Sequence, residues 1–216
     1  MKKFAFASAV AAFALVVAGS ASAATVSFTP DGASPEPGYT VIDNFNTAAG
    51  LTGVAGTDYL LTTNHDSQGA PPANSIPYDS NYLSVLGGGT ASINFSALTS
   101  ATVSAFEFDW GSIDSYNTLT IHSNLGDTVI IPGSLSFPNA ANGDQIAAGT
   151  NGLFKVIGSA GETFSGITLQ SGQNSFEIDN LAVAVPEPAT WAMMIMGMGA
   201  MGMALRSRRR TAGALA

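Results

Sequence analysis

The sequence predicts an all-β domain between residues 24 and 184, an antiparallel β-sandwich of the jelly-roll type. Short runs in which apolar and polar residues alternate recur along this stretch, and Gly, Asn, Ser and Pro separate them. No part of the stretch shows the apolar period of an amphipathic helix. Its length of about 160 residues suffices for one domain with a sizeable core, and no boundary for a second domain is visible.

Nine segments rich in β-branched and aromatic residues are the expected strands. In chain order they are residues 40–45, 82–86, 91–95, 103–110, 118–122, 128–131, 153–157, 163–169 and 175–183. A turn at Gly87-Gly88-Gly89 is expected to separate the second strand from the third. Two long loops, residues 64–81 and 138–152, interrupt the series. Such loops commonly carry binding residues but also occur as passive surface, and both interpretations stay open.

The clearest alternation lies in the strand 103–110. Its aromatic residues Phe106, Phe108 and Trp110 share one face, which is expected to belong to the core. Glu107 and Asp109 therefore share the other face.

These two acids and Asp114, which follows shortly after, are the candidates for chemistry. Two carboxylates are the minimum equipment of a glycosidase. The same acids could instead bind a metal, or form a polar sugar-binding rim beside Tyr116. The plainest interpretation is that they are acids at the end of a strand.

Other enzyme chemistry has little support in the sequence. No Ser, His and Asp form a nucleophile motif, and the only histidines, His65 and His122, fit no zinc spacing. We therefore expect no catalytic residue and no enzyme activity. Because the chain has no cysteine, its stability must come from a core or a bound metal.

The last expected strand contains an irregularity. Phe176 and Ile178 point to one side, but the next apolar residues are Leu181 and Val183, so the alternation slips by one position. A β-bulge at Asp179-Asn180 would explain the slip.

A metal site is one possible use of this bulge. Residues 42–45 and 178–181 have similar sequences, so Asp43 and Asp179 would come together if the first and last strands lie side by side. Two aspartates with backbone carbonyls suit a structural calcium ion. The alternative is a pair of solvent-facing Asp-Asn turns.

The predicted domain is strongly acidic. Residues 24–184 contain fourteen acidic residues and a single basic one, Lys155, which gives a net charge of −13. Such a surface repels nucleic acids and anionic polymers, and it favours divalent cations and neutral or cationic partners.

The N-terminus has the features of a secretory signal peptide over residues 1–23. Lys2 and Lys3 precede an apolar stretch, and Ala21-Ser22-Ala23 matches the small-residue cleavage pattern. Cleavage would leave Ala24 as the first residue of an exported protein.

The C-terminus combines a tripeptide, an apolar stretch and a basic cluster over residues 185–210. Pro186, Glu187 and Pro188 lead into the uncharged residues 189–205, which include Trp191. Seventeen residues are just enough for a transmembrane helix. Basic flanks stay in the cytoplasm, so the helix should end inside, followed by the tail end 211–216. The arginines of the cluster are Arg206, Arg208, Arg209 and Arg210.

This C-terminal segment resembles the PEP-CTERM sorting signal, in the variant with Trp-Ala after the tripeptide. The resemblance implies cleavage near Pro186-Glu187-Pro188 by an exosortase, a membrane protease, after a membrane-anchored intermediate. It also implies a Gram-negative bacterium that makes extracellular polysaccharide, and a final location at the cell surface or in the matrix. With segments 164–169 and 175–181, the stretch 106–117 further resembles a family of exosortase-dependent surface proteins. A second tripeptide, Pro35-Glu36-Pro37, lacks a following apolar run and is expected to be a turn-rich segment.

Together these features predict a structural or adhesive protein of an exopolysaccharide or biofilm matrix. The alternatives are a glycan-binding module for exopolysaccharide and a small glycoside hydrolase that uses Glu107 or Asp109.

Overall fold

The structure is a computed structural model that describes residues 23–47, 51–75, 80–134, 137, 140–184 and 196–199. It is mostly antiparallel β-structure, as the sequence predicts, and the short helix α1 (Phe95–Leu98) follows β4. The strands are β1 (Thr25–Pro30), β2 (Tyr39–Asp43), β3 (Val54–Thr62), β4 (Tyr82–Asn94), β5 (Ala105–Gly111), β6 (Asn117–Ser123), β7 (Thr128–Ile130), β8 (Gly152–Ile157), β9 (Phe164–Ser171) and β10 (Phe176–Ala184).

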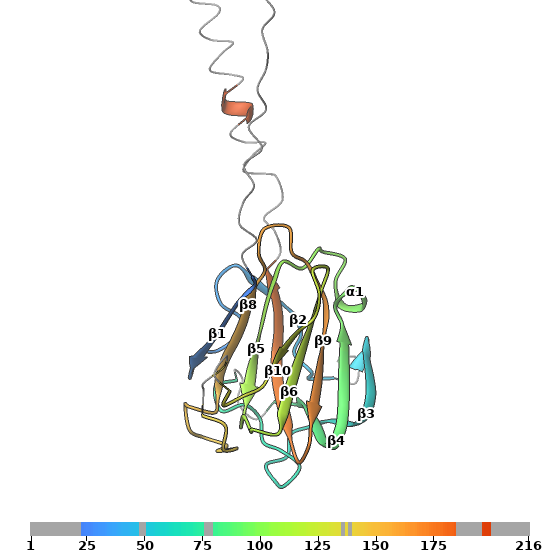
Figure 1. The fold of residues 1–216 in the computed structure, drawn as a ribbon, viewed down its shortest axis with the longest axis vertical. Helices are drawn as coiled ribbons and strands as arrows, with labels where there is room; N and C mark the ends of the chain where they lie inside the picture. Colours follow the sequence, from blue (N-terminus) through green and yellow to red (C-terminus); the bar gives the residue numbers. More distant parts are fainter. Residues whose placement is uncertain are drawn as a thin grey trace, which may run out of the picture.

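The strands form one continuous, curled sheet (Figure 1). Its order is β1-β8-β5-β10-β4-β9-β6-β7, with β2 paired to β10 and β3 paired to β4. Strand β4 makes the curl possible, because its first half pairs with β10 and its second half with β9.

The expected turn at Gly87-Gly88-Gly89 is therefore wrong. These glycines lie inside β4, where the strand changes partner opposite a register shift in β3. A Cβ on Gly89 would lie 2.6 Å from the carbonyl oxygen of Asp58, so only glycine allows this close approach. The three glycines mark a change of pairing partner within a strand instead of a turn.

All nine expected strand segments lie within or overlap strands of the structure, but β1 and β3 were not predicted. Strand β3 was missed because Gly56 and Asp58 interrupt its alternation of apolar and polar residues. Both residues have positive φ in the structure. Strand β1 gains its place by pairing with β8, a partner more than 100 residues away. Pairing at such separation has no local sequence signal.

The core lies inside the curl and is rich in aromatic residues. Phe106, Phe108 and Trp110 of β5 are all fully buried, which confirms the predicted core face. Trp110 stacks on Phe176 of β10, with 4.5 Å between ring centroids, and meets Phe154 of β8 edge-on at 5.4 Å. Such pairs add to the stability gained from burial alone.

The bulge predicted in β10 is confirmed. The register of β10 against β5 shifts between Asp179 and Ala182, and Asn180 has a φ of +48°. The condition stated for the metal site is met, because the first expected strand, β2, pairs with the last, β10, and Asp43 lies opposite Leu181.

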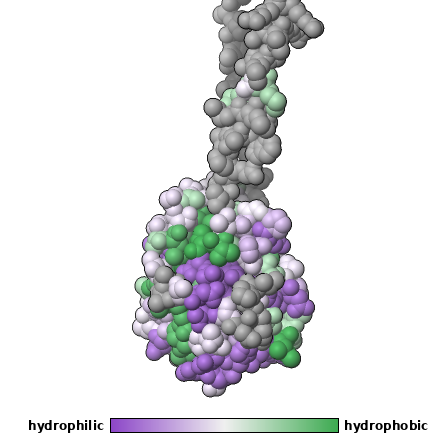
Figure 2. All heavy atoms as spheres, turned by 180° about the vertical axis from the view of Figure 1, so that it is seen from behind, coloured by the Kyte–Doolittle hydropathy of each residue, from purple (hydrophilic) through white to green (hydrophobic). Residues whose placement is uncertain are grey.

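The domain has two distinct ends. Thr25, which pairs with Ile157, and Ala184, the last residue of β10, lie at the same end of the sheet, which we call the terminal end. Gly111 and Glu177, paired in register, lie at the opposite or distal end. Hydrophilic residues cover most of the distal end on the face seen in Figure 2.

The predicted signal peptide and most of the C-terminal segment lie outside the described residues. Residues 196–199 are the described part of that segment and form one helical turn. Among the described residues, the structure contains no helix with the length and apolar character needed to cross a membrane. The transmembrane helix over residues 189–205 stays a prediction.

Candidate functional site

Four carboxylates lie buried on the face of the sheet opposite the aromatic core. They come from two paired strands, and Asp109 of β5 lies opposite Asp179 of β10. Glu107 and Glu177 complete the set, which we call the carboxylate layer. All four side chains are at most 1% exposed. Glu107 and Asp109 were expected at a strand end, but both lie inside β5, and chain segments from elsewhere cover them.

One covering segment is the connection between β1 and β2. The backbone N–H of Ser34 donates to Asp109 Oδ1 at 2.7 Å, and that of Glu36 donates to Glu107 Oε1 at 2.6 Å. The Glu36 side chain pairs with Lys155, the only basic residue of the domain. The second Pro-Glu-Pro tripeptide thus serves as a cover for Glu107, and the turn expected there is present as the Tyr39 N–H bond to the Glu36 carbonyl.

The second covering segment belongs to the long loop before β4. Asn74 donates to Asp109 Oδ1 at 3.0 Å, while the hydroxyls of Ser75 and Ser80 donate to Asp179 Oδ2 at 2.5 and 3.1 Å. One of the two expected loops is therefore no passive surface, since it is bound to the sheet by its polar side chains.

The pKa values of the four carboxyl groups in the carboxylate layer are raised. Burial is the main cause at every position, because it disfavours the charged form. The pKa of Asp109 rises to about 7 and that of Asp179 to about 6, with each group also repelled by a neighbouring aspartate. The pKa of Glu177 rises to about 7. Hydrogen bonds from the covering segments offset part of the rise.

The predicted calcium ligands both lie near the bulge, and the structure buries both of them. Solvent-facing Asp-Asn turns are therefore not what forms there. Asp43 Oδ1 accepts from the Phe45 N–H at 2.8 Å, and Asp43 Oδ2 is buried without a hydrogen-bond partner. Asp179 already accepts from Ser75, Ser80 and the N–H of Asn180. Within the described ranges, no group of three or more His, Cys, Asp or Glu side chains is arranged to hold a metal ion.

Calcium at Asp43 and Asp179 stays a prediction with a direct test. If the ion binds there, excess chelator should lower the melting temperature by several degrees, and added calcium should restore it, because a ligand of the native state raises stability. An Asp43→Asn variant should lose this response. A wild-type melting temperature that ignores the chelator would rule out the site.

A polar pocket lies at the distal end, beside Glu177. It encloses about 210 Å³ and draws on both long loops predicted from the sequence. The acids among its lining residues are Asp66, Asp114 and Glu177. The remaining lining residues are uncharged: Ser67, Gly69, Ser112, Tyr116, Asn142, Gly143, Gln145, Asn174 and Ser175. We call this the distal pocket.

Hydrogen bonds fix the carboxylates of the distal pocket in place. Ser112 donates to Glu177 Oε2 at 2.7 Å, and Ser175 donates to Glu177 Oε1. The hydroxyl of Tyr116 donates to Asp114 Oδ2 and lies 2.5 Å from the carbonyl oxygen of Asn174. Burial is the main cause that raises the pKa of Asp114, and Tyr116 lowers it in part.

Two glycines with positive φ pack their backbones closely against these acids. A Cβ on Gly143 would lie 2.5 Å from Asp114 Oδ2, and a Cβ on Gly69 would lie 3.0 Å from Glu177 Oε1. Any other residue at either position would crowd the carboxylate and strain the backbone. Glycine at these positions thus lets the backbone pack closely against both acids, and Glu177 stays buried.

The sequence singled out only part of this site. Asp114 and Tyr116 were candidates and do line the pocket, whereas Glu107 and Asp109 are absent from its lining and lie under the covering segments. Glu177 had no predicted role. Its single sequence signal is that it shares a strand face with Asp179, two residues on.

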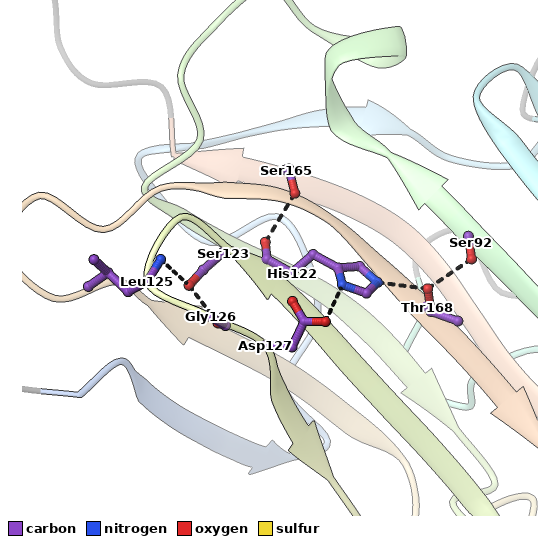
Figure 3. A network of polar contacts seen from close by, with 8 residues as sticks. All are labelled: Ser92, His122, Ser123, Leu125, Gly126, Asp127, Ser165 and Thr168. Atoms are coloured by element: carbon purple, nitrogen blue, oxygen red, sulfur yellow. Dashed lines mark hydrogen bonds and ion pairs between the residues drawn. The ribbon is translucent and has the colours of Figure 1, made fainter.

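The two histidines lie apart from the pocket. His65 is exposed in the loop before β4. His122, on the outer face of β6, forms an ordered network across neighbouring strands (Figure 3). Its Nδ1 lies 3.0 Å from Asp127, its Nε2 lies 2.9 Å from Thr168 Oγ1, and that oxygen lies 2.8 Å from the Ser92 hydroxyl. The network links surface polar groups of β4, β6 and β9.

Comparison with known proteins bears on the C-terminal segment. The profile of the PEP-CTERM protein-sorting motif matches residues 184–210. This match confirms the predicted sorting signal and marks an exported protein that passes through a membrane-anchored intermediate and is processed by an exosortase. No curated protein matches the chain in sequence.

Proposed function

We propose that this chain, which carries the PEP-CTERM sorting motif, presents a non-catalytic β domain with a structural or adhesive role in an extracellular polysaccharide matrix. The same proposal includes export through an N-terminal signal peptide and a transient transmembrane helix at residues 189–205. It also includes a jelly-roll-like sandwich as the fold of the domain. The motif supports the destination, and the distal pocket supports the role at that destination.

The observation that carries the proposal is the position of the pocket relative to the motif. The motif begins at Ala184, at the terminal end, whereas Glu177 and Gly111 lie at the distal end. A domain held at the membrane or cell surface through its C-terminus would thus turn the pocket away from that attachment. This is the orientation that an adhesive site needs.

Glycan binding is the form of adhesion that the pocket supports best. Carboxylates, amides and hydroxyls line it, and these groups recognise the hydroxyls of sugars through directed hydrogen bonds. A volume of about 210 Å³ corresponds to several water molecules and suits a single sugar unit better than a large ligand.

A glycosidase role has weaker support. Glu107 and Asp109, the acids that the sequence suggested, are fully buried and bound by Ser34, Glu36 and Asn74. No substrate could reach them without removal of the covering segments. Among the acids that line the pocket, Asp114 and Glu177 accept hydrogen bonds from neighbouring hydroxyls and Asp66 accepts one from the Gln68 N–H, which suits fixed recognition groups.

The sorting step can be tested with two isosteric substitutions in the two Pro-Glu-Pro tripeptides. In a host with an exosortase, Glu187→Gln should reduce the processed, externally recovered form by at least tenfold, because it alters the motif. Glu36→Gln should leave processing unchanged, because its tripeptide lies on the folded domain against Glu107. Mass spectrometry of the protein recovered outside the cell measures the C-terminus of each variant.

Two results would contradict this part of the proposal. One is a wild-type protein that reaches the outside with Arg206–Arg210 intact. The other is equal processing of the Glu187→Gln variant and the wild type.

A further inference from the structure

Three neighbouring strands of the sheet lack Asp, Glu, Lys and Arg altogether. They are β4, β9 and β6, which lie side by side. Their outward side chains are polar and stand opposite one another in rows, which together we call the outer polar face. Ser92, Thr168 and Thr120 form one row, and Thr90, Gln170 and Thr118 form the next. This face is an exception on a domain whose net charge is −13.

A groove lies on this face, toward the end of β4. It encloses about 290 Å³, and its polar lining residues are Ser92, Asn94, His122, Ser165 and Thr168. Ser92, Asn94 and Ser165 are exposed, while His122 and Thr168 are half-buried. A ligand can therefore reach these groups without removal of a covering segment.

Hydrogen bonds hold the polar groups of the groove in fixed positions. Thr168 Oγ1 lies 2.9 Å from His122 Nε2 and 2.8 Å from the Ser92 hydroxyl (Figure 3). Asn94 Oδ1 accepts from the Ser96 N–H at 3.0 Å, which orients the amide and leaves its nitrogen to donate to a ligand. The hydroxyl oxygens have two lone pairs each, so they can accept from a ligand as well. Groups that are already ordered lose little freedom when a ligand binds.

The chemistry of this face favours a carbohydrate over a protein as its ligand. Protein interfaces gather aromatic and other apolar residues at their centre. Among the described residues, all exposed large apolar side chains lie outside these three strands. Hydroxyl, amide and imidazole groups instead match sugar hydroxyls, which both donate and accept hydrogen bonds. The net charge of −13 repels an anionic glycan, and the three strands offer no carboxylate to a cationic one.

We infer that the groove on the outer polar face binds a sugar unit of an uncharged polysaccharide. This inference rests on the role in a polysaccharide matrix proposed above, but it uses a site separate from the distal pocket, since the two share no lining residue. A domain with both sites holds two polysaccharide segments at once and so links chains of the matrix.

The test is a nuclear magnetic resonance titration of the processed protein, or of the full chain in detergent if processing fails. The probes are tetrasaccharides of glucose, of mannose, of N-acetylglucosamine and of glucuronate, at pH 7 and 0.15 M salt. At least one of the three uncharged probes should shift the backbone amide signals of Ser92, Gly166 and Thr168 with a saturable dependence on concentration. The glucuronate probe should bind more weakly, because its charge has the same sign as that of the domain.

Two variants of the groove locate the binding. Thr168→Val keeps the shape of the side chain but removes its hydroxyl, and it should weaken binding about fivefold, the usual effect of one lost hydrogen bond. Ser92→Lys fills the groove with a long side chain from an exposed position and should abolish binding. The matched control is Thr29→Val, which makes the same change at an exposed threonine of β1, and it should bind like the wild type. Equal melting temperatures of the variants and the wild type would exclude unfolding as the cause.

Three results would overturn the inference. If no uncharged probe shifts the signals of the outer polar face, the groove is not a glycan site, while the sorting result stands independently. If the shifts are confined to residues of the distal pocket, such as Asn142 and Gln145, the proposed glycan-binding function survives and only the second site is lost. An equal loss of binding in Thr168→Val and Thr29→Val would show that the groove hydroxyl has no specific part. Shifts at the outer polar face without any at the distal pocket would support the inference and contradict the site proposed above.

Discussion

The domain should unfold at a clearly lower temperature at pH 8 than at pH 5.5. Asp109, Asp179 and Glu177 have pKa values near 7, 6 and 7 in the folded protein, mainly because burial disfavours their charged forms. In the unfolded chain, carboxyl groups have pKa values of about 4. Between these limits the folded state binds more protons than the unfolded state.

The sign of the effect follows from this difference. Stability falls with rising pH wherever the native state holds more protons, so it should decline from about pH 4 to pH 7 and then level off. One pKa unit corresponds to about 1.4 kcal/mol, so the three groups together are expected to cost several kcal/mol at pH 8. For a domain of this size each kcal/mol shifts the melting temperature by about 2–4 °C, so a decrease of roughly 10 °C is expected.

The decrease in melting temperature can be measured by thermal unfolding in the presence of chelator, with circular dichroism as the signal. Glu177→Gln should make the decline shallower, since the two serine hydroxyls that contact Glu177 can rotate to suit an amide. Asp109→Asn should instead destabilise the domain at all pH values. Its two oxygens accept three N–H donors, from Ser34, Asn74 and Asn180, and an amide group would oppose at least one of them. Equal melting temperatures at pH 5.5 and pH 8 would contradict the prediction.

Replacement of Trp110 by alanine should reduce the free energy of unfolding by about 3–5 kcal/mol, the range for large aromatic side chains in a core. Trp110 is fully buried and packs against rings of three other segments, Phe176, Phe154 and Phe137. Its loss would leave a cavity at the point where these segments meet.

A conservative variant separates the cavity from other effects. Trp110 Nε1 is buried without a hydrogen-bond partner, so Trp110→Phe removes an unsatisfied donor while it deletes only part of the ring. It should cost about 1–2 kcal/mol. Urea denaturation measures both variants, and a loss below 1 kcal/mol for Trp110→Ala would show that this position can repack.

Much of the fold could be predicted because local alternation records which side of a strand is apolar. The strand 103–110 showed its two faces clearly, and the slip between Ile178 and Leu181 located the bulge in β10. The turn expected at Gly87-Gly88-Gly89 failed for a related reason. Glycine marks unusual backbone geometry, and a strand that changes partner needs such geometry as much as a turn does.

The candidate site could be predicted only in part. Asp114 and Tyr116 stood out as a polar cluster after a strong strand, and both line the distal pocket. Glu177 could not be assigned, because its role depends on pairing with Gly111 and on loop residues such as Asp66. These residues are far apart in sequence, and no local pattern connects them.

The sequence alone determined the acidic, cysteine-free composition, the sidedness of the strands and the PEP-CTERM motif that directs the protein. Composition needs no structure to be read, and the strand faces and the motif are properties of residues close together in the sequence. Only the tertiary structure decided that the acidic face of β5 is buried and that a second acid-lined site opens at the distal end. The donors that cover Asp109 come from Ser34 and Asn74, 75 and 35 residues away, and a strand pattern cannot specify what will lie over it.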